Sequence, residues 1–274
     1  MPVRKIQVAY PVGKAALLTG VALVVVAATF MLVPPIPQWP EYHAFADRRG
    51  WFGIANVLDV LSNIPFLLIG WMGVVAAGRL TRGEGAAALR RLYRVLFVCV
   101  FLTGVGSMVY HLAPDNTMLV WDRLPMAIGF MALFATVIAE MVDYRWASRF
   151  LPLLLALGMG SVIYWAWSEA HGTGDLRGYG LVQFLPIGLI LLITALYPAP
   201  RHYLRHLFGL IAFYGISKAL EYSDTLVFDA LRGVVSGHTL KHLVATGGVL
   251  FVLHWIRRSG ASSETPWLTT KRPE

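Results

Sequence analysis

The feature that most constrains this chain is a series of long apolar stretches that contain few charged side chains. A helix needs about 20 mainly apolar residues to cross the hydrocarbon core of a bilayer. Eight stretches approach or exceed that length, and the last two are the least hydrophobic. We therefore predict an all-α integral membrane protein with eight transmembrane helices. The predicted spans are residues 15–33, 55–77, 95–112, 118–138, 150–167, 179–197, 204–222 and 235–256.

The composition excludes several classes of soluble protein. Of the 274 residues, 57% are hydrophobic and only 14% are charged, whereas soluble proteins average about 25% charged residues. A mean hydropathy of +0.62 argues against a disordered chain, an ordinary cytosolic enzyme and a nucleic-acid-binding domain, despite the net charge of +8. With Cys99 as its single cysteine, the chain has no disulfide framework and no Cys-based zinc site, so a metal site would use His, Asp or Glu.

The basic residues predict the orientation in the membrane. If eight helices alternate in direction, loops on one side hold sixteen of the 23 Lys and Arg residues, and loops on the other side hold four. Loops rich in Lys and Arg face the cytoplasm. Both termini are therefore predicted to be cytoplasmic, and the stretch 78–94, rich in Gly and Arg, is predicted to be the longest basic loop.

The first apolar stretch, residues 15–33, has two interpretations. Basic residues precede it, as they precede the core of a signal peptide. A signal core has about 7 to 15 residues, however, and a small-residue cleavage site follows it. Here 19 residues are followed by Val33-Pro-Pro-Ile-Pro37, so we predict a retained transmembrane helix.

Ionisable residues inside the predicted spans are concentrated at one depth. Such residues are costly in a bilayer and usually functional. His111 lies near the end of the third span, Asp122 near the beginning of the fourth, and His238 and His242 near the beginning of the eighth. Because the third and eighth spans are predicted to run antiparallel, all four side chains are expected at the non-cytoplasmic side.

The spacing of these residues suggests a metal-dependent hydrolase. His238 and His242 are four residues apart and share a helix face, so they can bind one ion, with His111 as a third ligand. Three His ligands and an open position are typical of catalytic zinc, which activates water. Asp122 is placed to accept a proton from water, and Ser107, one turn before His111, to donate a hydrogen bond to an oxyanion.

Simpler interpretations of the same residues remain open. A histidine in a membrane helix is often a hydrogen-bonded packing residue. The Ser107 hydroxyl is equally expected to bond a carbonyl of its own helix. Arg123 is interpreted as an ion-pair partner of Asp122 or as an interfacial anchor, and Lys218 and Glu221, three residues apart, as an intramembrane ion pair.

A second polar group surrounds the beginning of the second span. Its oxygens suit a hard cation such as Ca²⁺, and helix capping with polar packing is the alternative. The group consists of Asp47, Trp51, Asn56, Asp59, Ser62 and Asn63.

The ordered motifs resemble those of a known family. Ser107-Met-Val-Tyr-His111, Asp122-Arg-Leu-Pro125 and His238-Thr-Leu-Lys-His242 are similar to the S-x-x-x-H, D-x-x-P and H-x-x-x-H pattern of alkaline ceramidases and their bacterial relatives. These enzymes belong to a superfamily that includes the adiponectin-receptor-like hydrolases. The resemblance extends over about residues 45–255 and includes the Ser62-Asn63 pair. It implies that the three His bind zinc, that Asp122 is the general base and that Ser107 helps to stabilise the oxyanion.

The resemblance also divides the chain. The family core has seven helices, so residues 1–40 are predicted to be a cytoplasmic segment with an additional transmembrane helix, 41–258 the catalytic domain and 259–274 a polar tail. Eukaryotic alkaline ceramidases carry an acidic calcium cluster at the first core helix. Here that region contains no glutamate, which leaves Asp47, Asn56 and Asp59 as candidate ligands of a modified Ca²⁺ site.

The function implied is a zinc-dependent amidohydrolase in the bacterial inner membrane. Its substrate would be a ceramide-like membrane lipid, cleaved to a fatty acid and a sphingoid-type amine, and no nucleic acid partner is expected. Three alternatives stay open. They are a heptahelical receptor or transporter with a structural metal, a cytochrome with two of the His as haem ligands, and a hydrolase of another N-acyl or ester lipid.

Overall fold

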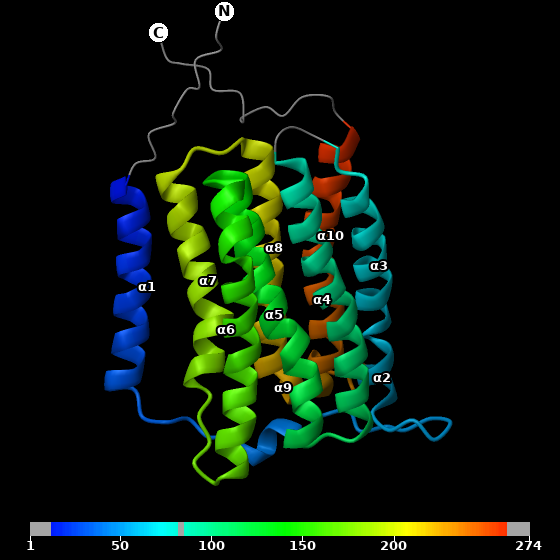
Figure 1. The fold of residues 1–274 in the computed structure, drawn as a ribbon. Coiled ribbons are helices and arrows are strands. Elements are labelled where there is room, and N and C mark those ends of the chain that lie inside the picture. Colours follow the sequence, from blue (N-terminus) through cyan, green and yellow to red (C-terminus); the bar gives the residue numbers. More distant parts are fainter. Residues whose placement is uncertain (1–11, 82–84, 262–274) are drawn as a thin grey trace, which may run out of the picture.

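The computed structural model describes residues 12–81 and 85–261. Within these ranges almost all regular structure is helical, and the one pairing of extended residues is an isolated bridge between Trp51 and Ile54. Figure 1 shows the long helices side by side as a bundle. In chain order the helices are α1 (Val12–Leu32), the short 3-10 helix η1 (Pro40–His43), α2 (Val57–Leu61), α3 (Ile64–Gly78), α4 (Ala86–Leu112), α5 (Asn116–Met141), α6 (Tyr144–Ala170), α7 (Arg177–Leu196), α8 (Arg201–Tyr222), α9 (Asp224–Ala230) and α10 (Gly237–Ala261).

Seven of the predicted spans are confirmed as helices long and apolar enough to cross a membrane. Among the described residues these are α1, the α2–α3 pair counted as one span, α4, α5, α6, α7 and α10. The predicted span 204–222 coincides with α8, which has 22 residues but does not reach the same apolar character. The side chains of Lys218 and Glu221 contribute to that difference.

The prediction of a long basic loop over residues 78–94 was wrong for its second half. α4 begins at Ala86 and continues without a break into the apolar span. The segment Ala86-Ala-Ala-Leu-Arg-Arg consists of strong helix formers, so the helix extends beyond the apolar stretch. Arg90 donates a hydrogen bond to the Leu80 carbonyl, and Arg91 donates one to the Ser148 carbonyl, which provides acceptors for both charges.

A break between α2 and α3 shapes the region of the candidate site. Pro65 lies in the first turn of α3 and has no backbone N–H, so it cannot continue the helical hydrogen bonding to the Leu61 carbonyl. The chain between the two helices holds Ser62 and Asn63, and both side chains are buried. The break therefore turns two polar side chains into the bundle.

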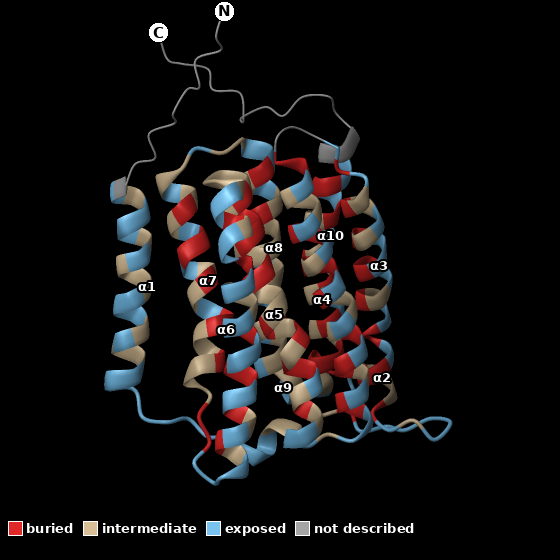
Figure 2. Cartoon of the chain, in the orientation of Figure 1, coloured by how far each residue is buried: buried red, intermediate tan, exposed pale blue. Residues whose placement is uncertain are grey.

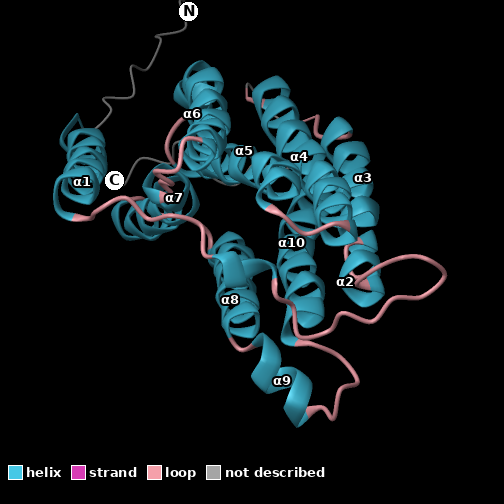
Figure 3. Cartoon of the chain, turned by 90° about the horizontal axis from the view of Figure 1, so that it is seen from below, coloured by secondary structure: helices cyan, strands magenta, loops and turns pink. Residues whose placement is uncertain are grey.

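The core is formed by a bundle from which α1 stands apart. α4 packs against α3 and α5, α5 against α6 and α7, and α10 against α8 and α3. In the view along the bundle, α1 lies outside and beside α7 (Figure 3). Figure 2 shows no buried residue along α1, in contrast to the inward faces of α4 and α5. The additional N-terminal helix is thus peripheral to the site.

Polar contacts at both ends hold α1 against α7. Lys14, near the beginning of α1, donates to the Leu196 carbonyl at the end of α7. At the other end, Nη1 of Arg177 donates to the Val33 carbonyl at 2.8 Å. α1 therefore spans the same depth as α7.

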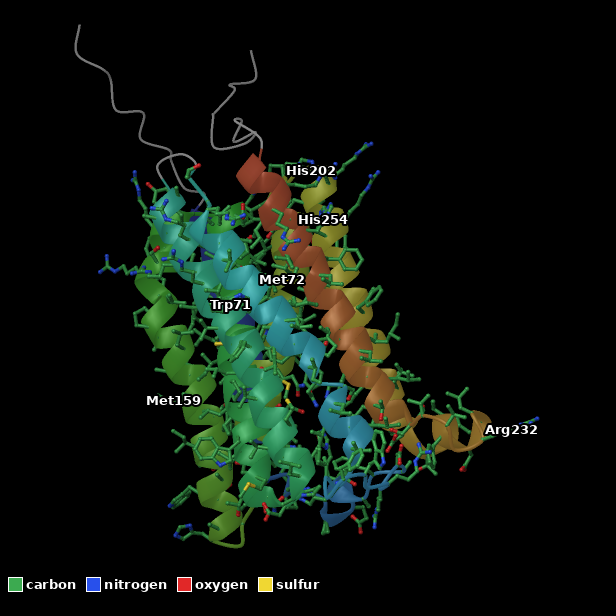
Figure 4. All side chains as sticks on the ribbon, turned by 90° about the vertical axis from the view of Figure 1, so that its right-hand side faces the viewer. Trp71, Met72, Met159, His202, Arg232 and His254 are labelled. Carbon is green, nitrogen blue, oxygen red and sulfur yellow. The ribbon has the colours of Figure 1, made fainter. Side chains whose placement is uncertain are left out.

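Large apolar side chains cover the outer face of the bundle. Trp71 on α3 and Met159 on α6 are 64% and 44% exposed, and both project outward from the middle part of the bundle (Figure 4). A soluble protein rarely exposes an apolar surface of this extent. The outer face is therefore suited to contact with lipid chains.

Candidate active site

Three buried histidines converge at one end of the bundle. His111 lies one residue before the last residue of α4, and His238 and His242 lie in the first two turns of α10. Each side chain is at most 6% exposed, and their ring centroids are 4.8 to 5.1 Å apart. In the described part of the chain they form the one group of three His, Cys, Asp or Glu residues able to hold a metal ion. The predicted convergence of these residues is confirmed.

One pair of donor atoms has the spacing expected of two ligands on a tetrahedral metal ion, and all three donor atoms lie within 4.8 Å of one another. Nε2 of His111 lies 3.3 Å from Nε2 of His238. Two imidazole nitrogens bound at about 2.0 to 2.1 Å to one tetrahedral ion would lie about 3.3 to 3.4 Å apart. Two axial haem ligands on opposite sides of an iron would be separated by roughly twice the bond length, about 4 Å. The spacing of His111 and His238 therefore fits a compact metal site better than the two axial positions of a haem.

Neighbouring groups fix the orientation of the histidines. Nδ1 of His242 lies 2.8 Å from the Ser62 hydroxyl, which leaves Nε2 for a ligand. The Asn56 side chain donates a hydrogen bond of 2.8 Å to the His111 carbonyl. Phe45 packs on two of the rings, with centroid distances of 4.8 Å to His111 and 4.4 Å to His238. Groups of this kind fix the rings and exclude water from metal ligands in proteins.

Asp122 and Ser107 lie in the wall of a large cavity together with His242. The cavity has a volume of about 430 Å³, and most of its surface is apolar. The Ser107 side chain, one helical turn before His111, is a hydrogen-bond partner of Asp122, and both residues are buried. The cavity thus combines a polar end, next to the histidines, with an apolar interior suited to a hydrocarbon chain.

A partly buried ion network borders the polar end of the cavity. Glu221 accepts hydrogen bonds from Lys218 at 2.5 Å and from Lys241 at 2.6 Å. The Tyr42 hydroxyl donates to the same carboxylate at 3.2 Å. Burial raises the pKa of Tyr42, so the phenol stays protonated and can act as this donor. The predicted Lys218–Glu221 ion pair is confirmed. Lys241 also binds Glu221, which the spacing of residues in the sequence did not indicate.

Arg123, next to Asp122, is enclosed by aromatic rings. Its guanidinium carbon lies 4.4 Å from the ring centroid of Trp165, 4.9 Å from that of Tyr179 and 5.2 Å from that of Tyr42. The prediction of an ion pair with Asp122 is not confirmed, because no salt bridge joins the two residues in the described structure. Arg123 is instead held by cation–π contacts from η1, α6 and α7.

Comparison with known proteins places the chain in a family. The ceramidase family model matches residues 52–257, which is well over half of the chain and includes all three histidines and Asp122. The chain belongs to the ceramidase family. Membership supports a membrane enzyme that hydrolyses the amide bond of a ceramide. No curated protein shows significant sequence similarity to the chain.

In this ceramidase family member, the side chains predicted for a second cation have other partners. Both carboxylate oxygens of Asp47 accept hydrogen bonds from Arg49, which lowers the pKa of Asp47. Asp59 accepts from the Thr239 hydroxyl at 2.6 Å, and Asn56 donates to α4. A Ca²⁺ site would require Asp47 to leave Arg49, whereas Oδ2 of Asp59 is buried and has no hydrogen-bond partner among the described residues. The calcium site stays a prediction, and no chemical step depends on it.

Three of the remaining histidines, His202, His206 and His254, lie away from the three-histidine group. His202 and His254 are at the opposite end of the bundle from Arg232, which follows α9 (Figure 4). His254 stacks on His206 with a centroid distance of 5.2 Å. Nδ1 of His43, the last residue of η1, lies 2.9 Å from the hydroxyl of Tyr110, the residue before His111 in α4. The sequence alone favours a surface or interfacial position for His43, whereas the structure places it half-buried against the neighbour of His111.

Proposed function

We propose that the protein is a zinc-dependent amidohydrolase that cleaves the N-acyl amide of ceramide-like lipids. The observation that carries the proposal is a group of three buried imidazoles, one of which, His242, lines an apolar cavity together with Asp122. His111, His238 and His242 would hold the ion, and imidazole is a preferred ligand of zinc. When bound, zinc supplies Lewis acidity toward the amide carbonyl and toward water.

The residues of the cavity wall have separate roles in this reaction. Asp122 accepts a proton from the attacking water and delivers it to the leaving nitrogen. In the described structure the Ser107 hydroxyl is a hydrogen-bond partner of Asp122. Once Asp122 has taken a proton from water, Ser107 no longer has to donate to it and would donate instead to the oxyanion that forms on the carbonyl. Ser62 orients His242 through Nδ1. The products are a fatty acid and a sphingoid-type amine.

The shape of the cavity supports direct access from the bilayer. Residues of α7 and of α8 line the cavity, but the two helices pack on different neighbours. α7 packs on α1, α5 and α6, whereas α8 packs on α10 and α9. Phe184 on α7 lines the cavity and is also 55% exposed on the outside of the bundle. A lipid chain could therefore enter sideways next to Phe184 without passing through water.

The proposed topology places the site at the non-cytoplasmic side of a bacterial inner membrane. α8 lies alongside α10 within the bundle (Figure 1), which supports a full crossing despite its charges. With eight crossings the basic residues give cytoplasmic termini, although several of those residues lie in 1–11, 82–84 and 262–274, outside the described part. We retain the predicted division of the chain into an N-terminal segment with the additional helix (1–40), a catalytic domain (41–258) and a polar tail (259–274). Residues 262–274 of the tail lie outside the described part.

The proposal can be tested by a hydrolysis assay with a matched control. Purified protein would be given neutral N-acyl sphingoid lipids and lipid esters, with and without a chelator, while bound metals are determined by elemental analysis. About one zinc per chain and chelator-sensitive release of fatty acid from the amides are expected. His111→Ala should lose both the zinc and the activity. His254→Ala, which changes an exposed His at the other end of α10, should retain both.

Other outcomes would distinguish the alternatives. Bound zinc without hydrolysis of any lipid would favour a receptor or transporter with a structural metal. Cleavage of esters but not amides would move the substrate to another lipid class. A Soret band in the absorption spectrum would favour a haem protein and contradict the zinc site.

A further inference from the structure

The cavity continues from the proposed reaction site deep into the bundle. Four helices line it over nearly the same depth, because on each of them the lining begins beside that site and ends ten or eleven residues away. The two ends are Ser107 and Leu96 on α4, Asp122 and Leu133 on α5, Glu221 and Leu210 on α8, and His242 and Val252 on α10. At a rise of about 1.5 Å per residue, the cavity is about 15 to 17 Å deep.

The lower part of the cavity has an apolar wall. Among the described residues, α7 lines the cavity only as far down as Phe184, and α4, α5, α8 and α10 line it below that level. Between α5 and α8 the rings of Phe130 and Tyr214 are in edge-on contact, with a centroid distance of 5.4 Å. A hydrocarbon chain that passes Phe184 is therefore directed along the bundle.

Three apolar side chains form the floor of the cavity. Leu133, Leu210 and Val252 line the large cavity and also line a second cavity of only about 20 Å³. They therefore separate the two. A space of this size holds about one water molecule, so a chain that reaches the floor finds little further room.

A hydrogen-bonded aromatic cluster supports the floor from the far side. The Tyr93 hydroxyl and Nε1 of Trp255 donate to the Glu140 carboxylate at 2.8 and 3.1 Å. The Tyr203 ring lies 4.9 Å from that of Trp255. The three aromatic side chains line the small cavity and are at most 5% exposed. Because buried networks of this kind rigidify a core, the floor is expected to resist displacement.

We propose that the lower cavity holds the fatty acyl chain of the substrate and that its floor limits this chain to about 14 carbons. The inference rests on the proposed amidohydrolase function, in which the amide carbonyl lies next to Ser107. From there the lining of α4 continues on one helix face through Thr103 to Leu96, so the acyl half of the lipid points toward the floor. An extended hydrocarbon advances about 1.3 Å per carbon, since its bonds of about 1.5 Å zigzag, and about 12 to 14 carbons fill the depth.

A floor produces a limit on chain length and not a general preference for long chains. The substrate comes from a bilayer whose tails are as apolar as the cavity, so each carbon that fits changes the affinity little. A longer chain must bend back or displace the floor, and overpacking of this kind corresponds to a loss of about 5- to 100-fold. We therefore expect kcat/KM to stay nearly constant up to the limit and to fall beyond it.

The test is a competition between ceramides that share one sphingoid base. N-octanoyl-, N-tetradecanoyl- and N-octadecanoylsphingosine would be present at equal mole fractions in one micelle, with the released fatty acids measured by mass spectrometry. Wild type is expected to release octanoate and tetradecanoate at similar rates and octadecanoate at least about fivefold more slowly. Leu133→Ala opens the floor and should remove most of this difference. Val249→Phe fills the cavity about 10 Å beyond His242 and should lower the release of tetradecanoate relative to octanoate.

Leu250 provides the matched controls. It is the neighbour of Val249 in α10, but it is 46% exposed and does not line the cavity. Leu250→Ala and Leu250→Phe make the same kinds of change on the outer face of the helix and should keep the wild-type ratios. Should Leu133→Ala not fold, Val252→Ala removes part of another side chain of the floor and takes its place.

Binding of lipids that cannot be hydrolysed separates this inference from the proposed function. In N-alkanesulfonyl sphingosines, a sulfonamide that resists hydrolysis replaces the amide. Analogues with the same three chain lengths would compete for the purified protein, and the bound lipid would be measured by mass spectrometry. Weaker binding of the octadecyl analogue that Leu133→Ala relieves would support the inference even if the protein hydrolyses no ceramide.

Three results would overturn the inference even if every ceramide is hydrolysed. The first is equal binding of the tetradecyl and octadecyl analogues by wild type. The second is a preference between them that opening the floor leaves undiminished. The third is a loss that depends on the length of the sphingoid base and not on that of the acyl chain, which would place the base in the lower cavity.

Discussion

The Ser62 hydroxyl lies 2.8 Å from Nδ1 of His242, across 180 positions of sequence. Ser62 occupies the break between α2 and α3, and its hydroxyl also bonds the Asp59 carbonyl at 3.0 Å. The contact sets the rotation of the His242 ring and leaves Nε2 for the proposed ion. The break between α2 and α3, early in the chain, thus orients a proposed metal ligand in α10, the last helix described.

Substitution of Ser62 should weaken metal binding. Loss of a group that orients a metal ligand typically lowers metal affinity by about 10- to 100-fold. We expect Ser62→Ala to show a loss of this size in a chelator competition assay, with the fold retained. Ser161→Ala removes a buried hydroxyl that bonds only the Gly158 carbonyl of its own helix among the contacts described, so it should leave metal affinity unchanged. Equal affinities of Ser62→Ala and wild type would show that the contact does not support the site.

Asp122→Asn should remove proton transfer without removing the metal. Asparagine has nearly the same shape but cannot accept a proton from water, and general base catalysis contributes about 10²- to 10⁴-fold. We expect kcat to fall within that range while elemental analysis shows an unchanged metal content. Asp115→Asn changes the exposed N-cap of the same helix to another good cap, so its kcat should match wild type. Undiminished turnover in Asp122→Asn would assign the proton transfer to another group.

Gly106 allows α4 and α5 to approach closely beside the site. A Cβ at this position would lie 2.0 Å from the Trp121 carbonyl oxygen, one residue before Asp122. Overpacking typically costs about 1 to 3 kcal/mol, and here a helix backbone would have to move. Gly106→Ala should therefore lower both the thermal stability and kcat.

Gly160→Ala is the matched control for that change. Nothing lies within 4 Å of a Cβ built at Gly160. Alanine in a helix interior is about 0.5 to 1 kcal/mol more favourable than glycine, so this variant should be as stable as wild type or more stable. Equal behaviour of the two variants in thermal unfolding would contradict the close approach of α4 and α5.

Acid should weaken the turn that precedes α7. The Arg177 guanidinium donates to both oxygens of Asp175, at 2.9 and 2.8 Å, and these hydrogen bonds lower the pKa of the buried carboxyl. An unfolded aspartate has a pKa of about 3.9. Because the folded pKa is the lower one, the carboxylate stabilises the fold above about pH 4, and this contribution is lost as the pH falls through the folded pKa.

The measurement is the thermal unfolding of wild type and Asp175→Asn as a function of pH. The stability difference between them should be constant from about pH 7 to pH 5 and should shrink below about pH 4. In the Arg177→Gln background, where the donors of Asp175 are removed, the same comparison should lose most of this pH dependence. A difference that stays constant down to pH 3 would contradict the stabilising role of the Asp175–Arg177 contact.

Part of the site could be predicted because its signals are local. His238 and His242 share a face through their spacing, and the alternation of helices brings the end of α4 to the beginning of α10, and with it His111. Lys218 and Glu221 meet for the same reason. These inferences need only the helical period and the direction of each span.

Other parts of the site depend on how each helix is rotated and how deeply it lies. Trp165, Tyr179 and Tyr42 surround Arg123 from three separate elements, and Lys241 joins Glu221 from α10 to α8. No spacing in the sequence relates these positions. The pairing of Asp47 with Arg49 likewise follows from the local course of the loop.

By itself, the sequence determined that the chain is suited to a lipid bilayer and where its seven apolar spans lie. It also determined the end of the bundle where the histidines gather. Hydrophobic length and helical periodicity are sufficient for those features, because the bilayer and the backbone impose them on any chain. Only the tertiary structure decided which polar groups became partners. Contacts such as Ser62 with His242, and the unsatisfied Nη1 of Arg123, depend on the rotation of helices packed from distant segments, and close packing fixes that rotation.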